Sequence, residues 1–209
     1  MEESVPYNPL SKRNLAGSIV SKLLNQPAEK LPPARFPGAG IYLIYYTGAF
    51  PPYARIARAN KQSRFAQPIY VGKAIPAGGR KGLEGFDVPH GFALSGRLGQ
   101  HADSITVAEN LNLDDFRCRW LVVDEVFIPL AESLLISNYK PLWNVILDGF
   151  GNHDPGKGRS SGKKPSWDVI HPGREWATPL SAANTVDELL ARIKSSMESA
   201  TIPPAAPDI

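Results

Sequence analysis

Three short segments of the chain are rich in β-branched and aromatic residues. They cover residues 40–46, 68–73 and 116–124. Runs of this length and composition predict β-strands. In the third segment apolar and basic residues alternate, which is typical of a strand with one buried face. Cys118 falls on the apolar side of that strand, so we expect it to be a small buried residue and not a nucleophile.

The first of these segments is unusual in its tyrosines. Because successive strand residues point to opposite faces, Tyr42, Ile44 and Tyr46 share one side. The second segment adds Tyr70. A buried phenol needs a hydrogen-bond partner, so a purely structural sheet would favour Val or Ile at such positions. The pattern is compatible with a functional site on this face and equally with an aromatic core.

Four segments have the apolar spacing or the capping residues of α-helices. They cover residues 11–26, 95–108, 129–140 and 185–197. Ser11 and Ser95 are expected N-caps, and Pro129 falls in a first turn, where its missing N–H has no intrahelical partner to lose. Thr185 and Glu188 have the spacing of a capping box at the start of the last helix.

These elements predict an α/β (α+β) fold, with a small three-stranded sheet flanked by helices. We expect an N-terminal helix and connector over residues 1–38, a core over 39–148, and a basic extension with a final helix over 149–209, all in one compact domain. Residues 47–67 are a long insertion between the first two strands. Because a hairpin needs only a few residues, this insertion is a candidate for DNA contact or dimerisation, or else a solvated decoration.

Two glycine-rich stretches interrupt the predicted elements. Residues 77–85 do not have the spacing of a phosphate-binding P-loop, which excludes a nucleotide site of that kind. Residues 149–164 are rich in Gly, Ser and Lys, and we expect them to be mobile when the protein is free. Residues 167–176 are expected to be ordered and to pack back on the core.

Charge and cysteine content narrow the class of protein. The 209 residues carry a formal net charge of +3, and basic stretches lie on either side of an acidic centre. This suits an enzyme that binds phosphate groups and a divalent metal, although a solvated surface gives the same pattern. The single cysteine excludes a disulfide within the chain and a Cys-based zinc site. We expect a cytoplasmic protein without a signal peptide or a membrane span.

Polar residues of a catalytic kind recur along these elements in a fixed order. Arg97 and His101 lie one turn apart on the second predicted helix, and Glu132 lies beside the apolar face of the third. Together with the Gly-Ile-Tyr and Tyr-Val-Gly motifs of the first two strands, this order resembles the GIY-YIG nuclease superfamily. The resemblance spans residues 40–144, and the second motif has Val where the family has Ile. The candidate catalytic residues are Tyr42, Tyr70, Arg97, His101, Glu132 and Asn144.

Within this superfamily the chain is similar to the type II restriction endonucleases that cut CCGCGG. The N-terminal helix, the insertion and the basic extension with His-Pro-Gly-Arg at 171–174 carry this narrower resemblance. It implies a site-specific deoxyribonuclease of the bacterial cytoplasm, acting as a homodimer on double-stranded DNA beside a cognate DNA methyltransferase. Three other interpretations stay open: a homing or repair nuclease of the superfamily, a DNA-binding module without catalysis, and an unrelated basic α/β protein in which the six residues are structural.

The resemblance also implies a role for each residue. Glu132 would hold one Mg²⁺ per active site, with Mn²⁺ as the other candidate, through a single carboxylate. Arg97 would bind the scissile phosphate with its planar fork of donors. Tyr42 would be the general base for water, with Tyr70 and His101 in reach, and His101 could equally be the base itself.

Further residues are expected to orient the site or to contact DNA. Asn144 would orient a neighbouring group through a hydrogen bond. Reading G·C pairs calls for Arg or Lys donors to guanine, and contacts to the DNA backbone call for more basic residues. The candidates for DNA contact are Arg55, Arg58, Arg64, Lys73, Arg80, Lys81, Lys157, Lys163, Lys164 and Arg174.

Overall fold

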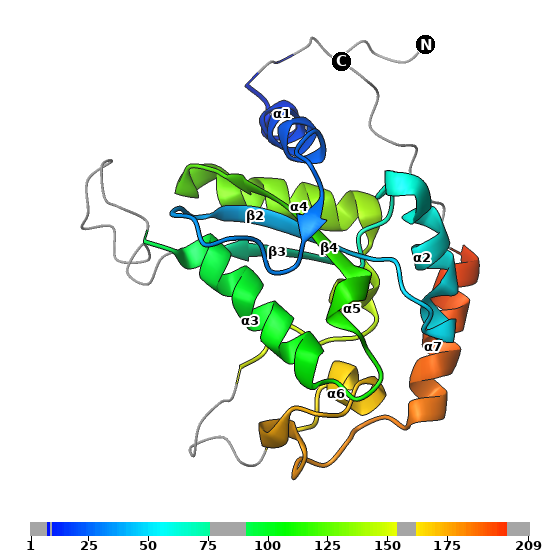
Figure 1. Cartoon of the computed structure of the whole chain (residues 1–209). Helices are drawn as coiled ribbons and strands as arrows, with labels where there is room; N and C mark the ends of the chain where they lie inside the picture. The colour runs from blue at the N-terminus through cyan, green and yellow to red at the C-terminus, as the bar shows by residue number, and fades with distance from the viewer. Residues whose placement is uncertain (1–7, 9, 76–90, 154–161, 200–209) are drawn as a thin grey trace, which may run out of the picture.

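An antiparallel sheet lies at the centre of the protein, with helices against both of its faces (Figure 1). This computed structural model describes residues 8, 10–75, 91–153 and 162–199. The sheet has four strands in the order β1-β4-β2-β3. The strands are β1 Glu29–Lys30, β2 Gly40–Tyr46, β3 Tyr70–Ala74 and β4 Phe116–Val122.

The central strand β2 pairs along its length with β4 and with β3. Tyr42 on β2 is opposite Gly72 on β3 and Trp120 on β4, and Ile44 is opposite Tyr70. Residues that are directly opposite in an antiparallel pair point to the same face of the sheet. The register therefore brings the two motif tyrosines, Tyr42 and Tyr70, to one face.

Helices follow and separate the strands. The α-helices are α1 Lys12–Leu24, α2 Ala54–Ala59, α3 Ala93–Val107, α4 Ile128–Tyr139, α5 Leu142–Val145, α6 Ser166–Ile170 and α7 Val186–Ser199. Short 3-10 turns occur as η1 Pro51–Tyr53, η2 Lys61–Ser63, η4 Leu113–Asp115, η5 Glu125–Phe127 and η7 Glu175–Ala177. In Figure 1, α1 and α4 lie on one side of the sheet and α3, α5 and α6 on the other.

The side chains of β2 alternate between two buried clusters, one on each face of the sheet. Tyr42, Ile44 and Tyr46 belong to the cluster on the side of α3 and α5. Leu43 and Tyr45 belong to the cluster on the side of α1 and α4. All residues of β2 are buried, as expected for a strand covered on both faces. The predicted alternation of this strand is confirmed.

Most predicted elements are present, and two details were wrong. Ser11 caps α1, because its Oγ accepts a hydrogen bond from the Asn14 N–H at 3.2 Å. Ser95 does not cap α3: the helix begins before it, and its hydroxyl donates to the Phe36 carbonyl at 2.7 Å. The prediction of three strands missed β1, which has too few residues to leave a pattern.

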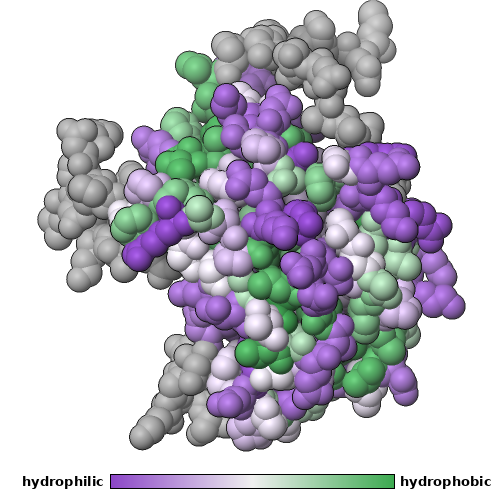
Figure 2. Space-filling model, viewed as in Figure 1, coloured by the Kyte–Doolittle hydropathy of each residue, from purple (hydrophilic) through white to green (hydrophobic). Residues whose placement is uncertain are grey.

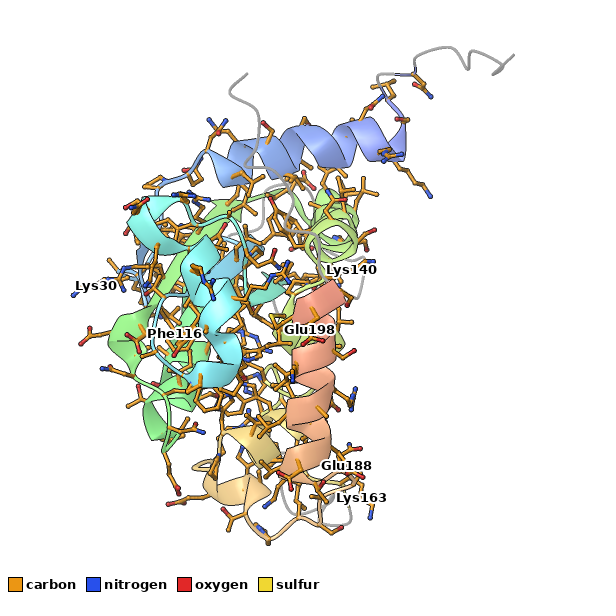
Figure 3. All side chains as sticks on the ribbon, turned by 90° about the vertical axis from the view of Figure 1, so that its right-hand side faces the viewer. Lys30, Phe116, Lys140, Lys163, Glu188 and Glu198 are labelled. Atoms are coloured by element: carbon orange, nitrogen blue, oxygen red, sulfur yellow. The ribbon has the colours of Figure 1, made fainter. Side chains whose placement is uncertain are left out.

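The insertion between β2 and β3 is folded against the C-terminal helix. It contains η1, α2 and η2, and the Arg55 guanidinium of α2 donates to the Met197 carbonyl of α7. Figure 3 shows α2 and α7 next to each other, with Glu188 near the start of α7 and Glu198 near its end. The predicted capping box is present, since the Thr185 N–H donates to the Glu188 carboxylate at 2.7 Å.

The surface combines polar and apolar side chains. Figure 2 shows hydrophilic residues over much of one face, with hydrophobic ones between them. The described helices include none that is long and apolar enough to cross a membrane.

Candidate active site

A buried hydrogen bond between β2 and α3 lies at the centre of the candidate site. The Tyr42 Oη and the His101 Nε2 are 2.6 Å apart. Tyr42 is fully buried and His101 is 1% exposed. Arg97 and His101 were expected on one face of a helix, where a surface pair was the simplest interpretation. The burial of His101 excludes that interpretation.

Glycine in each strand motif allows a close approach that a side chain would block. A Cβ at Gly72 would lie 2.3 Å from the Tyr42 Oη and 2.4 Å from its Cζ. Such distances are far inside van der Waals contact, so only glycine leaves room for the Tyr42 ring. A Cβ at Gly40 would lie 2.0 Å from the Leu121 carbonyl oxygen of β4. Gly72 thus leaves room for the Tyr42 ring, and Gly40 allows β2 to approach the β4 backbone closely.

Aromatic rings surround this pair. The Tyr70 ring centroid lies 6.2 Å from that of Tyr42 and 5.1 Å from that of His101. Phe150 stacks on the His101 ring, with centroids 4.5 Å apart and planes inclined by 16°. The same Phe150 contacts Tyr70 edge-on at 5.0 Å. Such packing holds the imidazole in one orientation.

Arg97 comes from the same helix face as His101 and reaches the loop after α5. Its Nη2 donates to the Gly151 carbonyl at 2.6 Å, and its Nη1 is hydrogen-bonded to the His153 Nε2. Nη1 also donates to the Gln100 side chain at 3.1 Å. Because Arg97 is only partly buried, its guanidinium combines fixed orientation with access from solvent.

The electrostatic environment keeps the proton on the phenol and off the imidazole. Burial raises the pKa of Tyr42 well above its ordinary value, and Tyr70 adds to this, while Arg97 lowers it. Burial lowers the pKa of His101 well below its ordinary value, and the charge of Arg97 lowers it further. His101 is therefore neutral near pH 7, and one of its nitrogens is available as an acceptor.

A carboxylate lies at the neighbouring edge of the sheet. The Glu132 Oε2 of α4 and the Lys73 Nζ of β3 form an ion pair at 2.7 Å, with side chains 18% and 38% exposed. The negative charge of Glu132 raises the pKa of both Tyr42 and Tyr70, so Glu132 belongs to the same electrostatic cluster. Within the described ranges, no three His, Cys, Asp or Glu residues gather as a metal-binding group.

Asn144 completes the outer edge of β3. Its Oδ1 accepts from the Val71 N–H and its Nδ2 donates to the Val71 carbonyl, both at 2.8 Å. The side-chain amide therefore pairs with Val71 as a neighbouring strand would. Because Val71 lies between Tyr70 and Gly72, Asn144 fixes the backbone that carries both.

The chain matches a known protein family over most of its length. A protein-family model described as the Eco29kI GIY-YIG domain matches residues 34–199 of the 209 residues. The chain belongs to this family. No curated protein matches it. Eco29kI-type GIY-YIG domains are restriction-type nucleases, and their substrate is DNA. The match covers all six candidate catalytic residues and extends through α7.

The candidate DNA contacts differ in how the structure places them. Arg58, Arg64 and Lys163 are exposed, and Lys164 is partly exposed. Arg80, Lys81 and Lys157 lie outside the described residues, as do the glycine-rich residues 77–85.

Arg174 contradicts the sequence-based expectation. It is 6% exposed, and its guanidinium is hydrogen-bonded inside the protein to Asp168 and to three carbonyls of the 149–152 segment. A buried guanidinium with these partners has no free donor for DNA. The same contacts correct the expected mobility of residues 149–164 for their first part, whereas residues 154–161 lie outside the described chain.

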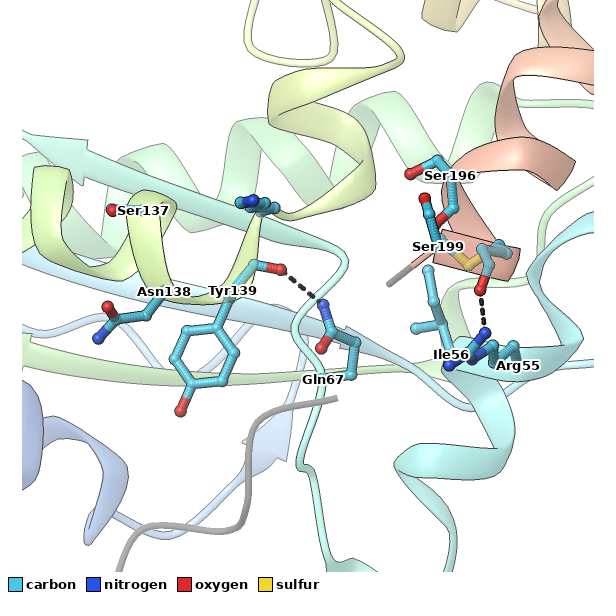
Figure 4. A pocket seen from close by; sticks show the side chains of 10 residues that line it. Arg55, Ile56, Gln67, Ser137, Asn138, Tyr139, Ser196 and Ser199 are labelled. Carbon is cyan, nitrogen blue, oxygen red and sulfur yellow. Dashed lines mark hydrogen bonds between the residues drawn. The ribbon is translucent and has the colours of Figure 1, made fainter. Parts of the chain in front are cut away.

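Arg55 faces a cavity and not the open surface. The cavity has a volume of about 580 Å³ and lies between α2, the end of α4 and α7 (Figure 4). Gln67 lines this cavity, and its side-chain amide donates to the Tyr139 carbonyl at 2.9 Å. Arg55 also donates to the Met197 carbonyl, and this hydrogen bond connects the insertion to α7.

Four residues that shape the site were missed in the sequence. Phe150 covers His101, Gly151 and His153 bind Arg97, and Asp168 pairs with Arg174. A Cβ at Gly151 would lie 2.8 Å from the Tyr70 Oη, so this glycine also allows a close approach. The glycine-rich composition of the segment predicted mobility and hid these contacts.

Proposed function

We propose that this protein is a type II restriction endonuclease that hydrolyses phosphodiester bonds of double-stranded DNA with the help of a divalent metal. The observation that carries the proposal is the buried hydrogen bond between Tyr42 and His101, with the charges of Arg97 and Glu132 both acting on the Tyr42 phenol. Membership of the Eco29kI GIY-YIG family supports it. Uncatalysed phosphodiester hydrolysis is slow enough that such a site has to lower the barrier by roughly 20 kcal/mol.

The carboxylate of Glu132 fits a Mg²⁺ or Mn²⁺ ion. It is partly exposed, and it already has a cation, the Lys73 ammonium, within 2.7 Å. Mg²⁺ beside phosphates is commonly held by one or two carboxylates, with water and phosphate oxygens as the other ligands. When bound, the ion would act as a Lewis acid on the phosphate and the leaving oxygen. Lys73, once displaced from Glu132, is a candidate to contact a DNA phosphate.

Arg97 is proposed to bind the scissile phosphate. Its guanidinium is oriented by Gly151 and His153 and remains partly accessible. A planar fork of N–H donors matches two phosphate oxygens and neutralises charge that builds up in the transition state. Its positive charge also favours the phenolate form of Tyr42, because it lowers the pKa of that group.

Tyr42 and His101 are proposed to remove the proton from the attacking water. In the free protein the proton stays on the phenol, because burial raises the pKa of Tyr42 and lowers that of His101. In the reaction the Tyr42 proton would pass to the His101 Nε2, and the phenolate oxygen would take a proton from water as the water oxygen attacks phosphorus. The bond from phosphorus to the 3′ oxygen then breaks, and solvent protonates that oxygen.

The proposed target is the palindrome CCGCGG, cut in both strands by a homodimer with one active site per strand. A two-fold DNA site calls for two copies of the protein related by the same symmetry. The exposed Arg58 and Arg64 on the insertion are proposed to donate to guanine or to phosphates. A cognate DNA methyltransferase would protect the host genome at the same sequence. Sedimentation of the protein with a cognate duplex should give two chains per duplex, and one chain per duplex would contradict the dimer.

Cleavage of a plasmid with a single CCGCGG site tests the proposal. The wild-type protein and the Glu132→Gln variant are compared with Mg²⁺ and with EDTA. We expect linear plasmid from the wild type with Mg²⁺, and circular plasmid in the other three reactions. Circular DNA from the wild type with Mg²⁺, despite retained DNA binding, would favour a DNA-binding module without catalysis.

A further inference from the structure

Arg174 has an unusually complete set of partners for a buried arginine. Its Nε donates to the Asp168 Oδ1 at 2.6 Å, and one Nη2 proton is directed to the Asp168 Oδ2. Nη2 also donates to the Gly149 carbonyl at 2.9 Å, and Nη1 donates to the Phe150 and Asn152 carbonyls at 3.3 and 3.0 Å. All five guanidinium donors are used.

Two indole rings hold the plane of this guanidinium. The Arg174 Cζ lies 4.7 Å from the Trp167 ring centroid and 4.8 Å from that of Trp176. A planar cation between aromatic faces is favoured electrostatically, and it loses little freedom when it binds several acceptors at once. Lysine can supply the charge but neither the plane nor the five donors.

The residues before Arg174 are anchored to the helix that carries Arg97 and His101. The Pro172 carbonyl accepts from the Glu109 N–H at 2.9 Å, just beyond the end of α3. Gly173 has φ +144°, and a Cβ there would lie 1.8 Å from the Val107 carbonyl oxygen. Glycine is therefore required at this position, and it sets the direction in which Arg174 enters the interior.

The segment that Arg174 holds is the segment that contacts the candidate active site. Phe150, whose carbonyl binds Arg174, stacks on His101 at 4.5 Å. Gly151, between two carbonyls that bind Arg174, accepts the hydrogen bond from Arg97 at 2.6 Å. One buried side chain is thus connected through residues 149–153 to both candidate catalytic residues of α3, Arg97 and His101.

We propose that Arg174 is a positioning residue for catalysis: with Asp168 it holds residues 149–153 against His101 and Arg97, and so fixes the imidazole and the guanidinium for the reaction. This inference rests on the proposed nuclease function and adds a role for the C-terminal extension, which completes the active site from within the protein. Geometric errors of about 1 Å at a reacting group cost on the order of 100-fold in rate.

The test compares wild type with Arg174→Lys and Leu23→Ala. Leu23 lies in α1 in the buried cluster on the other face of the sheet, so its truncation is a control for a general loss of stability. All three proteins are first checked by thermal unfolding, and measurements are made well below the lowest midpoint. Single-turnover cleavage of plasmid DNA gives the rate, and gel shift gives the DNA affinity.

A second readout requires no activity. The imidazole signal of His101, assigned with a His101→Gln variant, is titrated by NMR in each protein. For Arg174→Lys we expect a midpoint shifted toward the ordinary histidine value of about 6.5, because Phe150 no longer keeps water from the ring. We also expect a cleavage rate lower by about 100-fold, with DNA affinity changed less than threefold. For Leu23→Ala we expect the wild-type midpoint and rate.

The outcomes separate this proposal from the nuclease proposal. An Arg174→Lys variant that keeps the wild-type rate and the wild-type His101 midpoint overturns the positioning role. An equal loss of rate in Leu23→Ala overturns it too, because general instability would then explain both. If wild type itself does not cleave, the nuclease proposal fails, and the titration still decides whether Arg174 holds the segment on His101. If Arg174→Lys does not fold, Trp176→Ala takes its place, with a smaller shift expected in the same direction.

Discussion

Acidification should destabilise the protein through His171, a buried histidine beside the candidate active site. The Asn110 Nδ2 donates to the Ile170 carbonyl, so the Asn110 Oδ1 faces His171 and accepts from its Nδ1–H at 2.7 Å. The His171 Nε2 must then be unprotonated, and it accepts from the Tyr53 hydroxyl at 2.6 Å. A second proton on the ring would meet the Tyr53 hydroxyl proton in a site without solvent access. The network is therefore built for neutral histidine.

The magnitude follows from the pKa difference between the folded and unfolded states. Burial lowers the pKa of His171 from 6.5 to about 3. The unfolded chain then binds a proton that the folded chain does not, so stability falls as the pH drops below about 6.5. Between pH 7 and pH 5 this one group costs about 2 kcal/mol of the free energy of unfolding. The low pKa of His101 acts in the same direction.

Urea unfolding followed by tryptophan fluorescence, at several pH values from 7 to 5, measures this effect. The matched variant is His171→Gln, which keeps polar groups at the site and does not titrate. We expect the variant to be less stable than wild type at pH 7, and the difference to shrink by about 2 kcal/mol at pH 5. His101 is present in both proteins, so its contribution cancels. Parallel curves across this pH range would refute the reasoning, because His171 would then titrate alike in both states.

Three further predictions concern the site and its DNA. Tyr42→Phe removes only the hydroxyl that is hydrogen-bonded to His101. It should lower the single-turnover cleavage rate by about 100-fold or more without changing the DNA affinity. A rate within threefold of wild type would show that Tyr42 takes no part in the chemistry. Gly72→Ala places a Cβ 2.3 Å from the Tyr42 Oη. It should lower the free energy of unfolding by roughly 1–3 kcal/mol, measured by denaturant unfolding, and abolish cleavage in the plasmid assay. An unfolding midpoint equal to that of wild type would mean that the Tyr42 ring can move aside. In a third variant, Lys157, Lys163 and Lys164 are all replaced by Ala, and DNA affinity is measured by fluorescence anisotropy at several salt concentrations. The slope of log affinity against log salt concentration should become shallower by about 0.9 for each DNA phosphate that these lysines neutralise. An unchanged slope would show that they do not bind the DNA backbone.

Local signals explain what the sequence could predict. The alternation in residues 40–46 predicted both faces of β2 because a covered strand must bury both sets of side chains. The spacing of Arg97 and His101 predicted a shared helix face because residues four positions apart are neighbours on the surface of an α-helix. The Tyr-Val-Gly motif identified Gly72, but only the structure explains why glycine is needed there: the Tyr42 ring occupies the space of a Cβ.

Long-range contacts explain what the sequence could not predict. Arg174 was expected at the DNA because an arginine in a basic extension is usually exposed, yet Asp168 and two tryptophans bury it. Residues 149–153 have the composition of a mobile linker, and they are held by a side chain more than twenty residues further along the chain. Neither feature can be predicted from neighbouring residues in the sequence, because local composition does not determine which carbonyls a guanidinium distant in the sequence will bind. The two-residue strand β1 was missed because pairing with β4, and not its own sequence, defines it.

Digestion of an unmethylated phage genome tests the central claim most directly, because it presupposes no recognition site. Wild type, Glu132→Gln and Arg97→Lys are each incubated with the genome and Mg²⁺, with an EDTA control, and the products are separated on a gel. We predict a fixed set of discrete fragments from wild type with Mg²⁺, and intact DNA from both variants and from the EDTA control. Equal cleavage by wild type and Glu132→Gln, or intact DNA from a folded wild-type protein that binds it, would contradict the assignment of this site as the catalytic centre.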